Sequence, residues 1–259
     1  MTSRTITLPG AVNLRDFGGY AAEDGSLVRR GTLFRSGTLA HLSDEARARF
    51  ADLGVGLICD LRRPEERDQE PTPFPPSAPR RLEIPIDPGS AIAMRAELAE
   101  AGVDLKRRID FMVRINQELA REHADDYARM FEGLLELEDG GFLVHCSAGK
   151  DRTGFACALI LHALGVSEQT VLEDYLITNE VMDYEGYVLP RLAARYEAAG
   201  IPDREAVMAI AGVRPEYLGG AYQAIRDEFE GVEHYIERAV GLDAAARRLL
   251  QGRYLDRSG

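Results

Sequence analysis

The residue types that could do chemistry are concentrated in one short segment, where five residues separate Cys146 from Arg152. Apolar residues 141–144 precede the cysteine in a strand pattern, and an apolar helical pattern begins at Thr153. A strand, a tight loop and a helix N-terminus direct unpaired backbone N–H groups at one point and so form an anion site. We expect these dipoles and the nearby cation to hold Cys146 as a thiolate, a nucleophile beneath a bound phosphate.

The other loop residues receive roles from their chemistry. Arg152 carries a planar fork that can bind two phosphate oxygens and stabilise the equatorial oxygens of the transition state. Ser147, Ala148 and Gly149 are expected to bind phosphate mainly through backbone N–H groups. Gly149 also permits a backbone conformation, or a close approach of phosphate, that other residues do not. Thr153 would either hydrogen-bond the thiolate or cap the helix.

Lysine is rare in this chain, which makes the lysine inside the loop informative. Lysine occurs only at positions 106 and 150, so 29 of the 31 basic residues are arginine. The net charge of −12 repels anions at long range, so a phosphate site must be locally positive. We expect Lys150 to add a second positive charge at the rim of the site. The acidity of the chain also argues against a nucleic-acid partner.

The loop resembles the Cys-x5-Arg signature of the protein tyrosine phosphatase superfamily, and residues 145–152 resemble the bacterial atypical tyrosine/lipid phosphatases. Further segments similar to that family follow in the same order along the chain, at residues 13–19, 34–37, 60–62 and 174–179. The resemblance implies the tyrosine phosphatase fold, a central sheet with flanking helices. It implies a metal-independent cysteine phosphatase without a cofactor, which acts on phosphotyrosine and releases inorganic phosphate.

The substrate range is open at this stage. The resemblance extends the substrates to phosphoserine and phosphothreonine in proteins, with phosphoinositides as the alternative. Lys150 is associated in that family with a basic pocket for doubly phosphorylated or inositol head groups. Two other classes compete with a phosphatase: a rhodanese-type sulfur transferase and a non-catalytic phospho-ligand binding module. No His, Asp or Glu cluster in the sequence shows metal-ligand spacing.

Three aspartates qualify as the general acid that protonates the leaving group. Conventional tyrosine phosphatases use a mobile Trp-Pro-Asp loop, and this chain contains no tryptophan. Asp151 matches the acidic residue of the family loop, and we place it first. Asp60 follows the predicted strand that begins at Val55, and an ion-pairing or loop-capping role is its alternative. Asp87, at the end of the predicted strand 82–86, occupies the position of the acid in dual-specificity phosphatases.

The elements that would position these residues alternate between strands and helices. Short strands joined by a hairpin are predicted over residues 11–36, and further strands over 55–61 and 81–86. Helices are predicted over 43–52, from about 91 to 137, and throughout the chain after the loop. This alternation indicates an α/β fold with helices on the faces of the sheet.

We expect one phosphatase domain over residues 1–259, with a helical insertion over about 88–138 and a helical C-terminal part over about 166–259. The resemblance implies that the insertion is a lid, and a permanent layer on the sheet is the alternative. No apolar stretch is long enough to span a membrane, and residues 1–10 lack a signal-peptide core. We therefore expect a cytoplasmic protein without integral membrane contact, and leave export without a signal peptide open.

Several neighbouring residues have two interpretations. Cys59 and Cys157 are interpreted as core residues, with a reversible disulfide to Cys146 as the alternative. The segment 13–19 either buttresses the loop or is a strand and turn without a chemical role. His145 is expected to hydrogen-bond the loop backbone.

Overall fold

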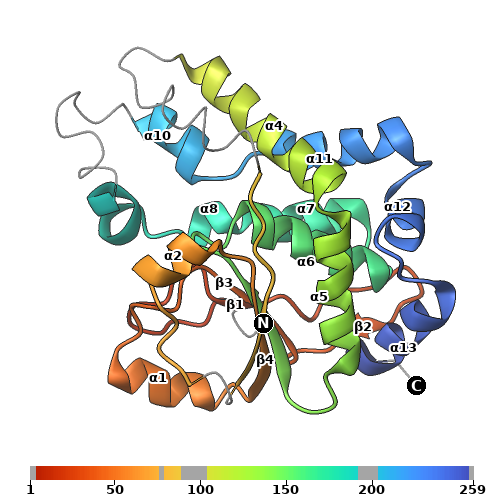
Figure 1. The fold of residues 1–259 in the computed structure, drawn as a ribbon, viewed down its shortest axis with the longest axis horizontal. Helices are drawn as coiled ribbons and strands as arrows, with labels where there is room; N and C mark the ends of the chain where they lie inside the picture. The colour runs from red at the N-terminus through yellow and green to blue at the C-terminus, as the bar shows by residue number, and fades with distance from the viewer. Residues whose placement is uncertain (1–3, 76–78, 89–103, 192–203, 257–259) are drawn as a thin grey trace.

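The computed structural model describes residues 4–75, 79–88, 104–191 and 204–256, and shows a five-stranded sheet with helices on both faces (Figure 1). The strand order is β1 (Arg15–Asp16), β3 (Leu33–Ser36), β6 (Gly141–His145), β4 (Val55–Asp60) and β5 (Arg80–Glu83). β1 is antiparallel to β3, and the other three neighbouring pairs are parallel. The predicted α/β fold is confirmed.

Three neighbouring strands end at the same level. Ser36 of β3 is the register partner of His145 of β6, and His145 is the register partner of Asp60 of β4. In an open parallel sheet, ligands bind outside the carboxyl ends of the strands. The loop that starts at Cys146 therefore lies between the loops that follow Ser36 and Asp60.

The parallel strands are apolar because both faces of the sheet are covered. Alternate residues of a strand point to opposite faces. Leu57 therefore belongs to the large core beneath α5 (Ala124–Glu136) and α6 (Asp151–Ala163), whereas Ile58 packs with Phe50 of α1 (Asp44–Ala51) on the other face.

The large face of the sheet carries most of the helices. α4 lies along α10 and α11, and these three helices are together at the top of the view in Figure 1. The helices beyond α5 and α6 are α4 (Leu105–Glu122), α7 (Glu168–Leu176), α8 (Thr178–Val181), α10 (Arg204–Ala211), α11 (Pro215–Glu228), α12 (Val232–Arg238) and α13 (Ala244–Tyr254). The predicted insertion supplies α4 and α5, and its part over 89–103 lies outside the described residues. A lid role for it stays a prediction.

Three elements differ from the sequence prediction. α2 (Pro64–Gln69) is a short helix in a region for which no element is predicted. The C-terminal part is not entirely helical, because β7 (Leu255–Asp256) pairs with β2 (Leu27–Val28). A π-helical turn, η1 (Tyr184–Val188), follows α8. Such turns occur frequently at functional sites.

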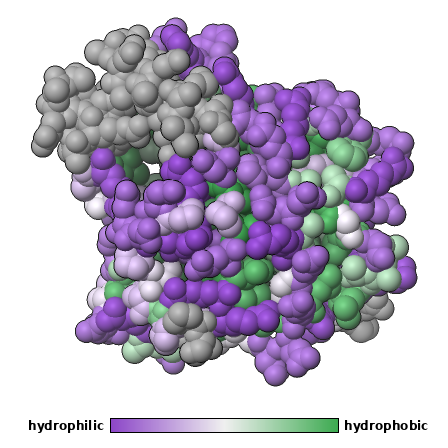
Figure 2. Space-filling view, viewed as in Figure 1, coloured by the Kyte–Doolittle hydropathy of each residue, from purple (hydrophilic) through white to green (hydrophobic). Residues whose placement is uncertain are grey.

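The surface is predominantly polar on the face shown in Figure 2. Among the described residues, Leu27 and Leu249 are the large hydrophobic side chains that are exposed. Within the same residues, no helix combines the length and the apolar character needed to cross a bilayer.

Candidate active site

Cys146 follows β6 directly and begins a loop that leads into α6; we call residues 146–150 the Cys146 loop. Only 3% of Cys146 is exposed, and its Sγ accepts a hydrogen bond of 3.3 Å from the Gly149 N–H. α6 begins at Asp151, and the side chain of its N-cap residue, Lys150, makes no capping hydrogen bond. The N–H groups of that turn are therefore available to an anion next to the sulfur.

Gly149 gives the Cys146 loop its shape. Its φ angle is +69°, which residues with a side chain rarely adopt. A Cβ at this position would lie 2.5 Å from the Gly37 nitrogen and 2.5 Å from the Ser36 carbonyl. Both contacts are with backbone, which cannot move aside cheaply. The loop therefore requires glycine here for its φ angle and for its packing.

Arg152 is held by a bidentate ion pair with Glu66 of α2. Its Nη1 lies 2.7 Å from Oε2 of Glu66, and its Nη2 lies 2.9 Å from Oε1. Nη1 also donates to the carbonyls of Leu61 at 3.2 Å and Ile86 at 3.3 Å. None of the contacts within the described residues uses Nε of Arg152. The Nε–H and the second Nη2 hydrogen form the edge that is left for two phosphate oxygens.

Glu66 is the functional residue that sequence reasoning missed. Besides Arg152, its carboxylate accepts the Ser147 hydroxyl at 2.7 Å and the Arg63 N–H at 2.9 Å. Burial alone would raise the pKa of Glu66, but Arg152 and these donors hold it well below its usual range. Ser147 thus contributes its side chain as well as its backbone. The available signal was a helix start, with Pro64 in the first turn followed by acidic residues.

The segment 13–19 supports the Cys146 loop from its other side. Asn13 Nδ2 and Arg35 Nη2 both donate to the Gly149 carbonyl, at 2.8 and 3.0 Å. Asn13 adopts a φ angle of +51°, and Arg15 donates to its Oδ1. These contacts favour the buttress interpretation over a strand and turn without a role.

Arg15, Arg35 and Asp174 form a buried cluster next to this buttress, which we call the lower cluster. Arg35 Nη1 lies 2.8 Å from Asp174 Oδ2, and Arg15 Nε lies 3.5 Å from Oδ1. Tyr20 donates its hydroxyl to Oδ1 at 3.1 Å. Burial works in the opposite direction, but the two arginines hold the pKa of Asp174 below its ordinary value. Segments that carry the family resemblance, far apart in sequence, therefore meet in one network.

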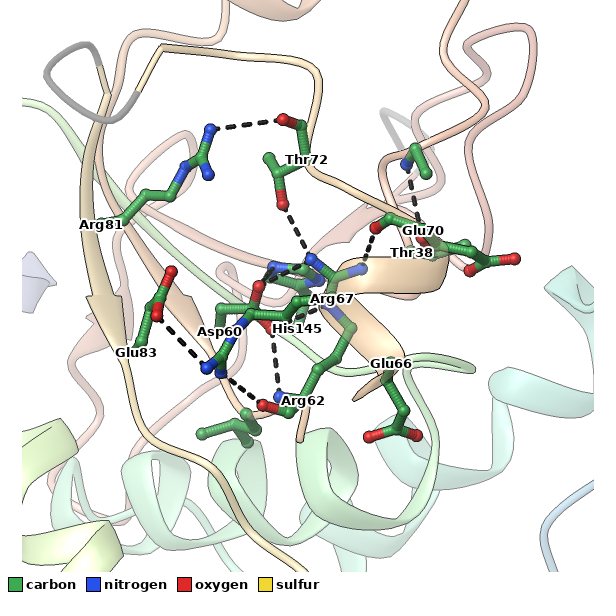
Figure 3. A network of polar contacts seen from close by, with 12 residues as sticks. Thr38, Asp60, Arg62, Glu66, Arg67, Glu70, Thr72, Arg81, Glu83 and His145 are labelled. Atoms are coloured by element: carbon green, nitrogen blue, oxygen red, sulfur yellow. Dashed lines mark hydrogen bonds and ion pairs between the residues drawn. The ribbon is translucent and has the colours of Figure 1, made fainter. Parts of the chain in front are cut away.

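Asp60 lies in a second buried network, shown in Figure 3. Arg62 donates to its carboxylate from Nε at 2.9 Å and from Nη2 at 2.7 Å, and Asp60 is only 1% exposed. Burial would raise the pKa of Asp60, but His145 and Arg62 hold it below its usual range. This geometry matches the ion-pairing alternative for Asp60.

His145 differs from the expectation that it hydrogen-bonds the loop backbone. Its Nε2 lies 3.4 Å from Asp60 Oδ2, and neither ring nitrogen has a hydrogen-bond partner among the described residues. The alternation of β6 places the side chain on the same face of the sheet as Leu143, whereas the next residue, Cys146, begins the loop.

The network of Figure 3 also fixes α2 against the end of β4. Arg62 Nη1 donates to the Glu70 carbonyl at 2.6 Å, and Arg67 donates to the Arg62 carbonyl at 2.6 Å. Arg67 also lies 3.3 Å from the Glu83 carboxylate. Because α2 is held at both ends, Glu66 presents its carboxylate to Arg152 from a fixed helix.

Lys150 and Asp151 are paired with each other. Lys150 Nζ lies 2.8 Å from Asp151 Oδ2 and donates to the Gly212 carbonyl at 3.3 Å. Asn179 holds the turn after Gly212, because its side chain makes two hydrogen bonds of 2.8 Å with the Val213 backbone. Lys150 is therefore 7% exposed and faces the turn between α10 and α11, whereas a rim position was expected.

The other expected residues occupy less central positions. The Asp87 side chain is 39% exposed and lies 3.5 Å from Arg63 Nη1. Thr153 Oγ1 is buried without a hydrogen-bond partner among the described residues, so neither of its expected contacts is present. Cys59 and Cys157 are buried free thiols, which confirms the core interpretation. Burial raises the pKa of Cys157 to about 12.

η1 contacts the Cys146 loop through Tyr187. The Tyr187 hydroxyl donates to the Ser147 carbonyl at 3.1 Å. The Arg191 guanidinium lies 3.8 Å from the centroid of the Tyr187 ring and pairs with Glu70, the C-cap residue of α2. Sequence reasoning gave no role to this tyrosine, because the contact joins segments 40 residues apart.

A thiol below a helix N-terminus, with an arginine edge beside it, defines a nucleophile site for phosphate esters. The chain belongs to the tyrosine phosphatase family, whose family model matches residues 6–256. The predicted family and the predicted enzyme class, a protein-tyrosine-phosphatase, are confirmed.

Three relatives show how much of the chain is shared. H16_A0669 of Cupriavidus necator, whose name assigns it provisionally as a tyrosine-protein phosphatase, is 34% identical over 248 residues, covering 94% of this chain and 85% of the relative. The triple specificity protein phosphatase PtpB of Mycobacterium tuberculosis is 29% identical over 275 residues, covering 95% and 97%. A tyrosine-protein phosphatase of Nostoc commune is 24% identical over 204 residues, covering 78% and 67%.

Proposed function

We propose that this phosphatase hydrolyses phosphotyrosine through a phosphocysteine on Cys146, and that phosphoserine and phosphothreonine are further substrates. The observation that carries the proposal is the orientation of Arg152. Glu66 occupies one edge of the guanidinium at 2.7 and 2.9 Å, and this leaves the Nε edge for the oxygens of a phosphate bound above Cys146. The name of the relative PtpB, a triple specificity protein phosphatase, supports a relaxed choice of substrate.

The reaction has two displacements at phosphorus. In the first, the Cys146 thiolate attacks phosphorus, an S–P bond forms, and the bond to the tyrosine oxygen breaks. The leaving oxygen takes a proton from a carboxylic acid. In the second, water attacks phosphorus and gives a proton to the carboxylate left by the first step, the S–P bond breaks, and inorganic phosphate and the thiolate are released. Arg152 and the backbone N–H groups of residues 147–150 stabilise the equatorial oxygens in both steps.

Asp151 is the proposed general acid. Its side chain is 17% exposed and lies at the first turn of α6, next to the Cys146 loop. Asp60 is 1% exposed and its carboxylate is bound by Arg62, so we assign it to holding the loop after β4. The Asp87 side chain is 39% exposed and lies outside the Cys146 loop, and we assign it no proton transfer.

Phosphoinositides are the alternative substrates. We place them second, because Lys150, the cation expected to receive a second phosphate, is bound to Asp151 and to the Gly212 carbonyl. The mechanism requires no metal ion, and the described residues contain no group of three metal-ligating side chains. We further propose a cytoplasmic location, on the sequence pattern alone.

The test is a substrate panel of phosphotyrosine, phosphothreonine and phosphoinositide, with and without a chelator. The wild type is compared with Cys146→Ser, and Cys157→Ser supplies the same chemical change at a buried thiol of α6. We expect Cys146→Ser to abolish hydrolysis and Cys157→Ser to retain it. Loss of activity with chelator, or full activity of Cys146→Ser, would overturn the mechanism. Thiosulfate-dependent turnover of cyanide would favour sulfur transfer, and tight phosphate binding without turnover would favour a binding module.

A further inference from the structure

The lower cluster contains one more cation than anion. Arg15 and Arg35 are each 0% exposed and share the single carboxylate of Asp174, which is 1% exposed. Burial and the neighbouring Arg35 lower the pKa of Arg15 to about 10, so both arginines stay protonated at neutral pH. Burial and Asp174 raise the pKa of the Tyr20 phenol, which therefore stays neutral. The cluster thus has a formal charge of +1.

This charge lies close to the sulfur of Cys146. Arg35 Nη2 donates to the Gly149 carbonyl at 3.0 Å, and the N–H of the same Gly149 donates to Sγ at 3.3 Å. A single residue therefore separates the guanidinium from the nucleophile. Both groups are buried, so dissolved salt screens their interaction much less than it screens a surface pair.

The charge also acts through the loop backbone. The Gly149 carbonyl accepts two hydrogen bonds, from Asn13 and Arg35. The carbonyl and the N–H of a trans peptide point in opposite directions. The N–H of Lys150, which shares this peptide group, therefore points away from Arg35. Two donors on the carbonyl polarise the peptide and make its N–H a stronger donor.

Two other cations at the Cys146 loop already have carboxylate partners among the described residues. Arg152 is paired with Glu66, and Lys150 is paired with Asp151. Within the described residues, the neutral titratable groups that interact with Cys146 are Tyr127 of α5, Tyr187 of η1 and Cys157 of α6. The Cys157 thiol also interacts with Arg15 and Arg35. The lower cluster therefore adds an unmatched positive charge to the surroundings of the Cys146 loop.

We propose that the lower cluster is an electrostatic positioning unit, whose excess charge stabilises the Cys146 thiolate and a phosphate dianion bound above it. Arg15 and Arg35 act through the Cys146 loop and do not contact substrate. The inference rests on the proposed function, which makes Cys146 the nucleophile.

The first test replaces Arg15 by glutamine, which removes one charge and keeps a hydrogen-bonding side chain. The rate of inactivation by iodoacetamide is measured against pH, and its midpoint reports the thiolate. We expect Arg15→Gln to move the midpoint up by about one pH unit and to weaken inhibition by inorganic phosphate roughly fivefold. The matched comparison is Asn13→Gly, which changes no charge, tolerates the positive φ, and removes one donor to the Gly149 carbonyl together with the Oδ1 acceptor of Arg15. We expect a smaller shift of the midpoint in this variant, because the charge of the cluster is unchanged. A shift in Asn13→Gly as large as that in Arg15→Gln would overturn the proposal.

The second test changes the charge in the opposite direction. Asp174→Asn leaves both arginines without a carboxylate, and we expect the inactivation midpoint to move to lower pH and phosphate to inhibit more strongly. A purely structural cluster predicts the same direction in Arg15→Gln and Asp174→Asn, and that result would overturn the proposal. If a thermal melt shows that Asp174→Asn is not folded, the comparison of Arg15→Gln with Asn13→Gly tests the proposal.

The proposed function and this inference fail in different ways. If alkylation of Cys146 leaves phosphotyrosine hydrolysis intact, the proposed function fails. If alkylation inactivates the enzyme but the variants share one midpoint, the lower cluster alone loses its assigned role.

Discussion

The two ends of α6 differ in how their backbone groups are satisfied. At the first turn the N-cap residue, Lys150, makes no capping hydrogen bond with its side chain, and the Cys146 loop precedes the helix. At the last turn, Arg247 of α13 donates to the carbonyls of Ala163 at 2.9 Å and His162 at 3.1 Å, and Gln251 donates to Ala163 at 3.1 Å. Gly165, with a φ angle of +82°, then ends the helix.

This difference separates function from stability along one helix. Unsatisfied N–H groups near a buried thiol reduce the stability of the free protein. They form favourable hydrogen bonds only when an anion binds there. Satisfied carbonyls at the other end stabilise the helix whether or not substrate is present. Substitutions near the first turn should therefore change catalysis, and substitutions near the last turn should change unfolding.

The strongest test of this comparison is Arg152→Lys. An ammonium group cannot replace the two-pronged pair with Glu66 and the second edge at the same time, so the transition state loses its aligned donors. We expect kcat to fall roughly a thousandfold, with a change in Tm of only a few degrees. A variant that loses its fold together with its activity would show that the first turn is also a stability element.

Glu66→Gln is expected to have the next largest effect. The amide keeps a hydrogen-bond acceptor for Ser147 but loses the charge that fixes Arg152. Misplacement of the guanidinium should lower kcat/KM for phosphotyrosine roughly thirtyfold. Glu65→Gln, on the same helix, is the control and should leave kcat/KM unchanged. Equal losses in the two variants would indicate a general effect of charge on α2.

The pH dependence of the stability tests the last turn of α6, because that turn contains His162. Burial lowers the pKa of His162 to about 4, and its Nε2 lies 2.9 Å from the Tyr222 hydroxyl. As the pH falls, the imidazole of His162 takes up a proton near pH 6.5 in the unfolded chain but only near pH 4 in the folded protein. The contribution of His162 to the free energy of unfolding is therefore fully present above pH 6.5 and decreases as the pH falls towards 4. The loss should reach roughly 2 kcal/mol at pH 5.

The measurement is the free energy of unfolding in urea at pH 7 and pH 5. His162→Asn should show a smaller difference between the two values than the wild type does. Its phosphatase activity at pH 7 should stay within the experimental error. An unchanged difference would mean that His162 does not contribute to the acid sensitivity.

Arg247→Met is expected to have the smallest effect. The variant keeps an apolar stem but removes the donors to the last carbonyls of α6. Unfolding should become easier by about 1 kcal/mol, with no change in kcat. Chemical denaturation measures the first quantity and phosphotyrosine turnover the second. A fall in kcat would show that the two ends of α6 are coupled.

Local pattern was sufficient for the parts of the site that are contiguous in sequence. The apolar run before Cys146, the spacing to Arg152 and the glycine between them predicted the strand, the loop and the helix that the structure contains. The apolar strand that leads to Asp60 was predicted for the same reason. These features depend on neighbours within one turn or one strand, which a single sequence displays.

Contacts between distant segments were not predictable. Glu66 and Arg152 are 86 residues apart, and nothing in either segment indicates that they pair. The direction of Lys150 depends on a turn 62 residues away, at Gly212. His145 contacts Asp60 because β4 and β6 are register neighbours, which is a property of the sheet. Side-chain partners of this kind depend on the topology of the fold, and the spacing of residues in the sequence does not define that topology.

The contact between η1 and the Cys146 loop is a suitable position for a fluorescent reporter of substrate binding. The chain has no tryptophan, so Tyr187→Trp would introduce a single indole fluorophore whose N–H replaces the phenol as donor to the Ser147 carbonyl. Its emission would respond to an occupant of the neighbouring loop without interference from any other indole. Stopped-flow traces of this variant with inorganic phosphate would then time the arrival and departure of an anion.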